Sequence, residues 1–161
     1  MEIYDSLLGA VCDEYDRVTL IKKSERGEVT LIRHRASGNR YIFRHFSGSS
    51  EVYRKLLTVS CPNLPQIMEV GEKEGKTALL EEYVQGDTLG EILQGGLLTA
   101  AQAKQITRQL CMALWVLHSL GVVHRDVKPD NVIIRGTEAV LHTAQNTIRR
   151  MAVPLKIEHR I

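Results

Sequence analysis

The sequence contains few cysteines and arranges none of them as a pair. Its three cysteines, Cys12, Cys61 and Cys111, lie about fifty residues apart, and no Cys-x-x-Cys motif occurs. An odd and scattered set argues against a disulfide scaffold and favours a reducing compartment. We therefore expect the cysteines to be small buried hydrophobic residues rather than metal ligands or redox groups.

Long apolar runs and a strong charge of one sign are also missing. No apolar stretch approaches the roughly 20 residues that span a bilayer, and the N-terminal segment lacks the basic region of a signal peptide. The formal net charge of +2 is too small to indicate binding to nucleic acid or to a membrane. The expectation is a soluble, cytoplasmic protein with no nucleic-acid partner and no membrane partner.

What remains is an ordinary globular composition. The 161 residues are 43% hydrophobic and 25% charged, which suffices for one domain, or two small lobes, with a real core. The charge is unevenly distributed, because residues 142–161 hold four basic residues against one acidic residue. The rest of the chain is nearly balanced, so the positive excess lies in this tail.

Hydrophobic spacing predicts a strand-rich first half followed by a long helix. Helical periodicity predicts an amphipathic helix over 1–15 and a short helix over 51–59. Alternating or apolar runs bounded by turn residues predict strands over 17–21, 29–34, 40–46, 67–70, 77–84 and within 132–141. A capping box of Thr99 and Gln102 begins the long helix, and Gly121 ends it. This order predicts an α+β protein, with a small antiparallel β-rich lobe containing one helix packed against a helical lobe.

The segment 124–131 carries the strongest chemical signal in the sequence. It reads HRDVKPDN and follows directly after the long predicted helix. The pattern His-Arg-Asp-x-Lys-x-x-Asn is similar to the catalytic loop of eukaryotic-type serine/threonine protein kinases. Within that resemblance, lysine two places after the aspartate is usual in serine/threonine kinases and unusual in tyrosine kinases.

The resemblance implies a role for each of three residues in this loop. Asp126 would accept the proton of a substrate hydroxyl, and Lys128 would neutralise charge on the transferred phosphoryl group. Asn131 would hold Asp126 in place and act as a ligand of a magnesium ion. The implied cofactors are ATP and Mg²⁺, and the implied partner is a protein that carries the serine or threonine hydroxyl.

The resemblance extends upstream of the loop and covers about 17–141. Gly27 and Val29 resemble the end of the glycine-rich loop that covers the nucleotide phosphates. Arg44 stands where the family has a strand lysine that contacts the nucleotide. The family pattern pairs that cation with a helix glutamate, for which Glu51 is the candidate. Glu51 follows Arg44 more closely than kinases usually allow, so an ordinary surface contact of Glu51 stays open beside the pair.

Two shorter matches and the domain boundaries follow from the same resemblance. Residues 61–63 read CPN and resemble the HPN turn after the first helix. Glu82 and Val84 resemble the hinge, where their backbone groups would meet adenine. The implied parts are an N-terminal helix over 1–16, a kinase N-lobe over 17–84, a hinge and partial C-lobe with the catalytic loop over 85–141, and a non-family basic tail over 142–161.

The match to the kinase pattern fails at several positions. Lys22 and Ser24 occupy the first two glycine positions of the phosphate-covering loop, and Glu81 stands where kinases place an apolar or small residue. After Leu141 the sequence continues HTAQNTIR, without the DFG-type aspartate that would chelate magnesium. We therefore expect weak or absent enzymatic activity. We also expect 142–161 to be foreign to the fold through truncation or a frameshift, or else to be a natural divergent tail.

Two alternatives stay open beside an active kinase domain. One is a non-catalytic, pseudokinase-like binding module or a gene fragment, in which the exposed face of an incomplete C-lobe would promote self-association. The other is a small-molecule phosphotransferase of the aminoglycoside-kinase type, which shares the Asp-x-x-x-x-Asn spacing. Those enzymes usually have glycine after the histidine and lack the lysine, so Arg125 and Lys128 favour the protein-kinase resemblance.

Overall fold

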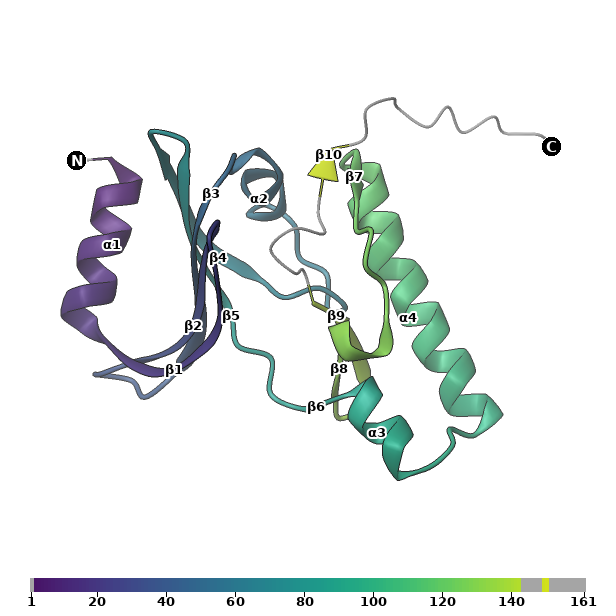
Figure 1. The fold of residues 1–161 in the computed structure, drawn as a ribbon. Helices are drawn as coiled ribbons and strands as arrows, with labels where there is room; N and C mark the ends of the chain where they lie inside the picture. The colour runs from purple at the N-terminus through teal and green to yellow at the C-terminus, as the bar shows by residue number, and fades with distance from the viewer. Residues whose placement is uncertain (1, 143–148, 151–161) are drawn as a thin grey trace.

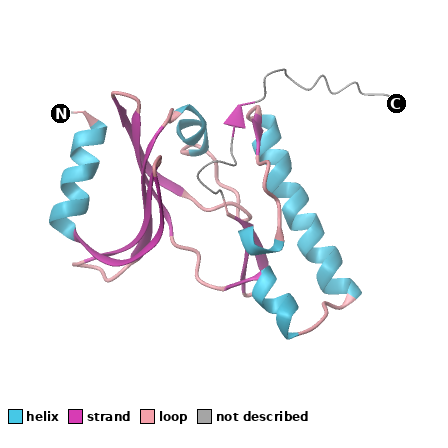
Figure 2. Cartoon of the chain, in the orientation of Figure 1, coloured by secondary structure: helices cyan, strands magenta, loops and turns pink. Residues whose placement is uncertain are grey.

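The computed structural model describes residues 2–142 and 149–150, which form two lobes (Figure 1). The first lobe is a five-stranded sheet with helices on both sides, and the second is built around one long helix (Figure 2). An extended connection after β5 (Lys76–Glu82) leads from the first lobe to the second. The arrangement confirms the predicted α+β class, with a hinge between a β-rich lobe and a partial helical lobe.

The strands of the sheet run antiparallel in the order β1-β2-β3-β5-β4. The strands that precede β5 are β1 (Tyr15–Ser24), β2 (Gly27–His34), β3 (Arg40–Ser47) and β4 (Ile67–Lys73). Because successive side chains of a strand point to opposite sides, the sheet presents two faces. One face packs against α1 (Ile3–Glu14), and the other faces the second lobe.

The helix α1 covers the outer face of the sheet. Tyr4 and Leu7 are buried against four sheet residues, namely Ile32, Phe43, Ala78 and Leu80. The Tyr4 hydroxyl also lies 2.7 Å from Nε2 of His45 on β3. A Cβ at Gly71 of β4 would lie 2.5 Å from the Tyr4 Cα, so only glycine lets α1 come this close to the sheet.

The inner face supports α2 (Glu51–Leu56), which begins after the buried Ser50. The Glu72 carboxylate of β4 accepts hydrogen bonds of 2.7 Å from both the backbone N–H and the hydroxyl of Ser50. These hydrogen bonds lower the pKa of Glu72 below its ordinary value, so the carboxylate is ionised at neutral pH. Glu72 therefore ties the N-terminus of α2 to the sheet.

The second lobe shares its hydrophobic core with the first. It contains α3 (Leu89–Gly95), α4 (Ala100–Ser119) and the short 3₁₀ helix η1 (Pro129–Asn131). Its short strands are β6 (Asp87–Thr88), β7 (Val122–Val123), β8 (Val132–Arg135) and β9 (Glu138–Leu141). Ala113 and Leu117 of α4 belong to one buried cluster with Tyr53 of α2 and Leu79 of β5. Apolar packing therefore continues from one lobe into the other.

Most elements lie close to their predicted limits. The capping box of Thr99 and Gln102 is confirmed, with the Gln102 N–H donating to the Thr99 hydroxyl at 3.2 Å. The second helix is shorter than the predicted 51–59, and α3 was not predicted. Its signal is present in the sequence, because Thr88 and Glu91 form the same kind of capping box.

The last described strand pairs with the second lobe. In the antiparallel pair of β10 (Arg149–Arg150) with β7, Arg149 lies opposite Val123. Apart from His142 and this strand, the predicted foreign tail over 142–161 falls outside the described residues.

The structure bears on two expectations drawn from composition. All three cysteines are free thiols, and Cys61 is buried as expected. Cys12 and Cys111 are exposed, so the expectation of small buried residues is wrong for these two. Within residues 2–142 and 149–150, no helix is both long and apolar enough to cross a membrane.

Candidate active site

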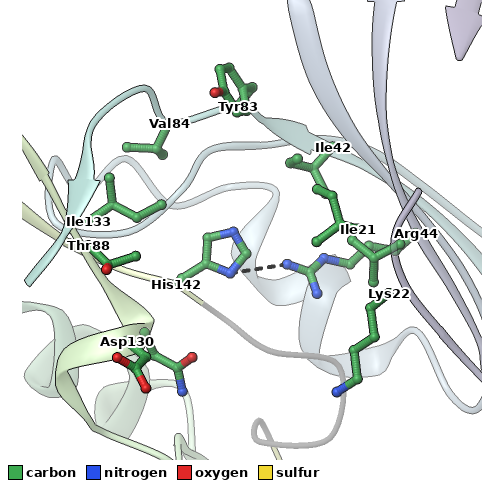
Figure 3. A pocket seen from close by; sticks show the side chains of 12 residues that line it. Ile21, Lys22, Ile42, Arg44, Tyr83, Val84, Thr88, Asp130, Ile133 and His142 are labelled. Carbon is green, nitrogen blue, oxygen red and sulfur yellow. Dashed lines mark hydrogen bonds between the residues drawn. The ribbon is translucent and has the colours of Figure 1, made fainter. Parts of the chain in front are cut away.

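A cavity of about 340 Å³ lies between the inner face of the sheet and the second lobe (Figure 3). Its apolar walls come from both lobes, with Val29 and Ile42 from the sheet, Val84 from the hinge and Ile133 from β8. Small-molecule sites have volumes of about 300–1,000 Å³ and mostly apolar linings. The cavity therefore has the size and character of a small-ligand site.

Charged and polar side chains gather along the same cavity. Lys22 comes from β1 and Arg44 from β3. Asp130 and Asn131 come from η1, and His142 follows β9. The cavity therefore combines an apolar slot with cations and hydrogen-bonding groups, an arrangement suited to a ligand with a flat ring and an anionic part.

Arg44 forms a buried ion pair with Glu81 of β5. Its Nη2 donates a hydrogen bond of 2.6 Å to the Glu81 carboxylate, and the two side chains are only 2% and 0% exposed. Arg44 pairs with Leu79 across the strands and Glu81 with Ile42, so the two charged residues are diagonal neighbours on one face. Burial lowers the pKa of Arg44, but the Glu81 carboxylate outweighs it and raises the pKa above its ordinary value.

This geometry corrects the predicted partner of Arg44. The expected carboxylate was Glu51, whereas the structure brings Glu81 into the pair. The Glu51 side chain is 49% exposed at the start of α2 and lies 3.8 Å from the Lys55 ammonium. A carboxylate on the adjacent strand reaches Arg44 directly, whereas Glu51 lies in the exposed first turn of the helix.

His142 stands on the cavity side of the ion pair. Its Nδ1 lies 3.3 Å from Nη2 of Arg44, and its Nε2 lies 3.6 Å from the Glu81 carboxylate. Two buried atoms of the pair, Nε of Arg44 and Oε2 of Glu81, have no hydrogen-bond partner among the described residues. The resemblance predicts a DFG-type segment at this point of the chain, and the structure places an imidazole here instead.

The residues of the segment 124–131 form a hydrogen-bonded group beside the cavity. The Asn131 amide donates 2.8 Å hydrogen bonds to both the backbone oxygen and the carboxylate of Asp126. The Lys128 ammonium lies 3.3 Å from the same carboxylate. His124 is 1% exposed, and its Nε2 lies 2.8 Å from the backbone oxygen of His142, so it holds the loop rather than facing a substrate.

The electrostatics of the loop keep Asp126 ionised. The hydrogen bond from Asn131 and the nearby Lys128 ammonium lower the pKa of Asp126 below its ordinary value. The chain turns sharply just before it, because Arg125 has a left-handed φ of 68°. Such a conformation is costly for a residue with a side chain and is often found at functional sites. The arrangement presents an ionised carboxylate that can accept a hydrogen bond or a proton.

The hinge residues hold the connection between the lobes. The Glu82 carboxylate receives a hydrogen bond of 2.5 Å from Arg135 and one of 3.1 Å from the Gln66 N–H. Val84 is 4% exposed, and its side chain lines the cavity. In the part of the chain that the structure describes, the N–H of Val84 has no hydrogen-bond partner.

Gly27 has a structural explanation that the sequence did not suggest. It does not line the cavity described above, and it pairs with Phe46 where β2 begins. A Cβ at this position would lie 2.2 Å from the backbone oxygen of His45. The glycine is therefore required by the close approach of β3, independently of any phosphate.

The structure brings four predicted residues to one cavity, namely Val29, Arg44, Val84 and Asn131. The cavity also contains residues that the sequence did not single out, including Ile21, Thr88 and Asp130. In the sequence, Glu81 stands out only as a charged residue where kinases place an apolar or small one. Pairing the predicted strands 40–46 and 77–84 in register would have placed it beside Arg44.

The implied magnesium ion is only partly matched by these residues. Asn131 offers an amide oxygen at the cavity, a ligand type that Mg²⁺ accepts. Within the described part of the chain, no cluster of three or more His, Cys, Asp or Glu residues could hold a metal ion. The family's second ligand, the DFG-type aspartate, has no counterpart in the sequence after Leu141. The residues therefore do not form a complete magnesium site.

Comparison with known proteins identifies the architecture. A model of the protein kinase domain matches residues 17–144. The chain is 35% identical over 92 residues to serine/threonine-protein kinase pkn2 of Myxococcus xanthus, covering 55% of this chain and 11% of that protein. It is 29% identical over 134 residues to serine/threonine-protein kinase DCLK3 of Mus musculus, covering 77% of this chain and 17% of that protein.

The fold agrees with a solved kinase structure. The crystal structure of Rad53 1-466 in complex with AMP-PNP superposes with a TM-score of 0.68 at 20% sequence identity, covering 82% of this chain and 38% of that one. The chain thus spans only a small part of the curated relatives it matches and less than half of the solved structure. With a family match over most of its length and a kinase-like arrangement of sheet, hinge and catalytic loop, the chain belongs to the protein kinase family.

Proposed function

We propose that this chain supplies the nucleotide site and catalytic loop of a serine/threonine protein kinase, directing the γ-phosphate of ATP to a protein hydroxyl. The observation that carries the proposal is the group of Asp126, Lys128 and Asn131, in which Asn131 also lines the cavity. One short segment thus touches both the nucleotide space and the carboxylate that would meet the substrate.

The cavity suits the base of a nucleotide. Ile42 and Val84 face each other across an apolar slot that matches the two faces of a flat ring. The N–H of Val84, which has no partner among the described residues, would donate to a ring nitrogen at the hinge. An apolar slot with one directional hydrogen bond is a usual way to orient an aromatic base.

The loop suits the alignment of a hydroxyl. Asp126 is ionised and fixed by Asn131, so it can orient a serine or threonine O–H and accept its proton. Lys128 brings a positive charge to the same carboxylate, where it would stabilise negative charge on the transferred group. Bound Mg²⁺ neutralises charge between the phosphates in this family, and the incomplete ligand set supports weak activity for this chain.

A thermal-shift experiment with millimolar ATP tests the nucleotide site. A ligand that binds only the folded protein raises its melting temperature by mass action. We expect a rise for the wild type and none for Ile133→Trp, in which an indole fills the slot. The matched control is Val127→Trp, at a residue that is 48% exposed, and it should keep the rise. No rise in the wild type would remove the proposal.

A non-catalytic nucleotide-binding module is the second candidate. The observation in its favour is His142, which stands beside Arg44 where the family pattern predicts the DFG-type segment. A binding module would show the ATP-dependent rise in melting temperature without transferring phosphate. The melting temperature with ATP and the phosphate-transfer assay together therefore separate an active kinase domain from a non-catalytic binding module.

We also propose that copies of this chain associate with one another through the exposed face of the incomplete second lobe. The α4 side chains Met112 and Trp115 are 50% and 65% exposed, although methionine and tryptophan are mostly buried in folded proteins. Self-association through this face stays a prediction. Sedimentation velocity over a range of concentrations tests it, and a constant monomeric coefficient would contradict it.

A further inference from the structure

Arg44 of β3 stands where the family has a lysine, and the Glu81 carboxylate neutralises its charge. Arg44 shares a 2.6 Å hydrogen bond with Glu81 in a pocket where the two side chains are 2% and 0% exposed. The same Nη2 atom lies 3.3 Å from Nδ1 of His142, on the cavity side. A ligand phosphate that reached Arg44 would meet a neutral pair screened by an imidazole. The Arg44–Glu81 pair therefore attracts an anion only weakly.

A second cation lines the same cavity without such compensation. Lys22 extends from β1 toward the cavity in Figure 3. No ion pair or hydrogen bond of its side chain occurs among residues 2–142 and 149–150. It is also exposed, so its ammonium can move to meet an incoming anion.

The backbone of β1 explains why Lys22 points into the cavity. In a regular strand, neighbouring side chains lie on opposite faces, yet Ile21 and Lys22 both line the cavity. The pairing of β1 with β2 shifts register between Leu20 and Lys22, which marks a bulge. Bulges next to active sites turn a side chain toward the site. The irregularity therefore gives Lys22 its direction.

We infer that Lys22 is the residue that binds the phosphates of the nucleotide in this site. The inference rests on the proposed nucleotide site and assigns the phosphate contact to a side-chain ammonium on β1. Two features leave the phosphates without the family's usual contacts. The phosphate-covering loop lacks its first two glycines, and the charge of Arg44 is neutralised by Glu81. An ammonium is a compact, mobile cation that suits a flexible polyphosphate.

Titration calorimetry with ATP and with adenosine tests this role. Lys22→Ala should weaken ATP binding about tenfold, the loss expected for one charge-assisted contact, and should leave adenosine binding unchanged. Lys22→Arg keeps the charge and should retain most of the ATP affinity. The dependence of ATP affinity on salt should also be shallower in Lys22→Ala, because one charge interaction is removed.

Lys23→Ala is the matched control, because it removes the same charge from the next residue of the same strand. The Lys23 side chain lines a separate hollow with Ser24 and Gly27, away from the cavity. ATP affinity unchanged in this variant supports the inference. An equal loss of ATP affinity in Lys23→Ala and Lys22→Ala, or a loss of adenosine affinity in Lys22→Ala, would overturn it. A wild type that binds neither compound would instead remove the proposed nucleotide site itself.

Discussion

The guanidinium of Arg44 and the carboxylate of Glu81 form a 2.6 Å ion pair between neighbouring strands of one sheet. Because both side chains are withdrawn from water, each charge depends on the other for compensation. The family pattern draws the partner of this cation from a helix, whereas here it comes from β5. The pair is therefore built into the sheet and does not require α2 to supply a charge.

Removing one partner of the Arg44–Glu81 pair should destabilise the protein more than removing both partners. Glu81→Leu leaves a buried guanidinium without its carboxylate, which costs about 3–5 kcal/mol. The double variant Arg44→Met/Glu81→Leu removes both charges and should recover most of that loss. Urea unfolding of the wild type, the single variant and the double variant measures the free energies. A double variant as unstable as Glu81→Leu would show that the pair is not what Glu81 stabilises.

The anchor between Glu72 and Ser50 should make stability depend on pH. The pKa of Glu72 is lowered in the folded protein from its ordinary value of 4.5, so its contribution is fully present above that pH. It is lost as the pH falls through the folded pKa, because the unfolded chain takes up the proton first. Unfolding free energies between about pH 6 and pH 3 should fall more steeply in the wild type than in Glu72→Gln. Parallel curves would contradict the anchor.

The contact of α1 with the sheet should not tolerate a side chain at residue 71. Gly71→Ala places a Cβ 2.5 Å from backbone atoms of Tyr4, so the helix must shift. We expect a loss of about 1–3 kcal/mol in unfolding free energy. Gly9→Ala is the control within α1, where a Cβ meets nothing within 4 Å. It should stabilise by about 0.5–1 kcal/mol through helix propensity. An unchanged unfolding free energy in Gly71→Ala would mean that α1 does not pack closely against Gly71.

The Asn131 amide should orient the Asp126 carboxylate and keep its pKa low. Asn131→Ala removes the 2.8 Å hydrogen bond to the carboxylate, which is the main cause of the lowered pKa of Asp126. We expect the pKa of Asp126 to rise toward its ordinary value, measured by carboxyl carbon NMR as a function of pH. Asn131→Asp, which adds a like charge beside the carboxylate, should raise it further. An unchanged titration in Asn131→Ala would show that the hydrogen bond does not orient the aspartate.

Local features were predictable from residue spacing alone, whereas long-range pairings also require the register between strands. The capping box of Thr99 and the loop around Asp126 depend on residues a few places apart, so sequence spacing identifies them. The partner of Arg44 depends on strand register across a separation of 37 residues, so the family pattern pointed to Glu51 and not to Glu81. Lys22 gains its direction from a bulge, which alternating hydrophobicity does not reveal.

Transfer of labelled phosphate from ATP to a generic protein substrate tests the central claim most directly. The comparison is between the wild type and Asp126→Ala, with melting temperatures of both confirming that the fold is intact. Because a positioned base contributes about 10²–10⁴-fold to such a reaction, we predict weak incorporation in the wild type that vanishes in Asp126→Ala. Equal signals from the two proteins, or no signal from either, would contradict catalysis through this loop.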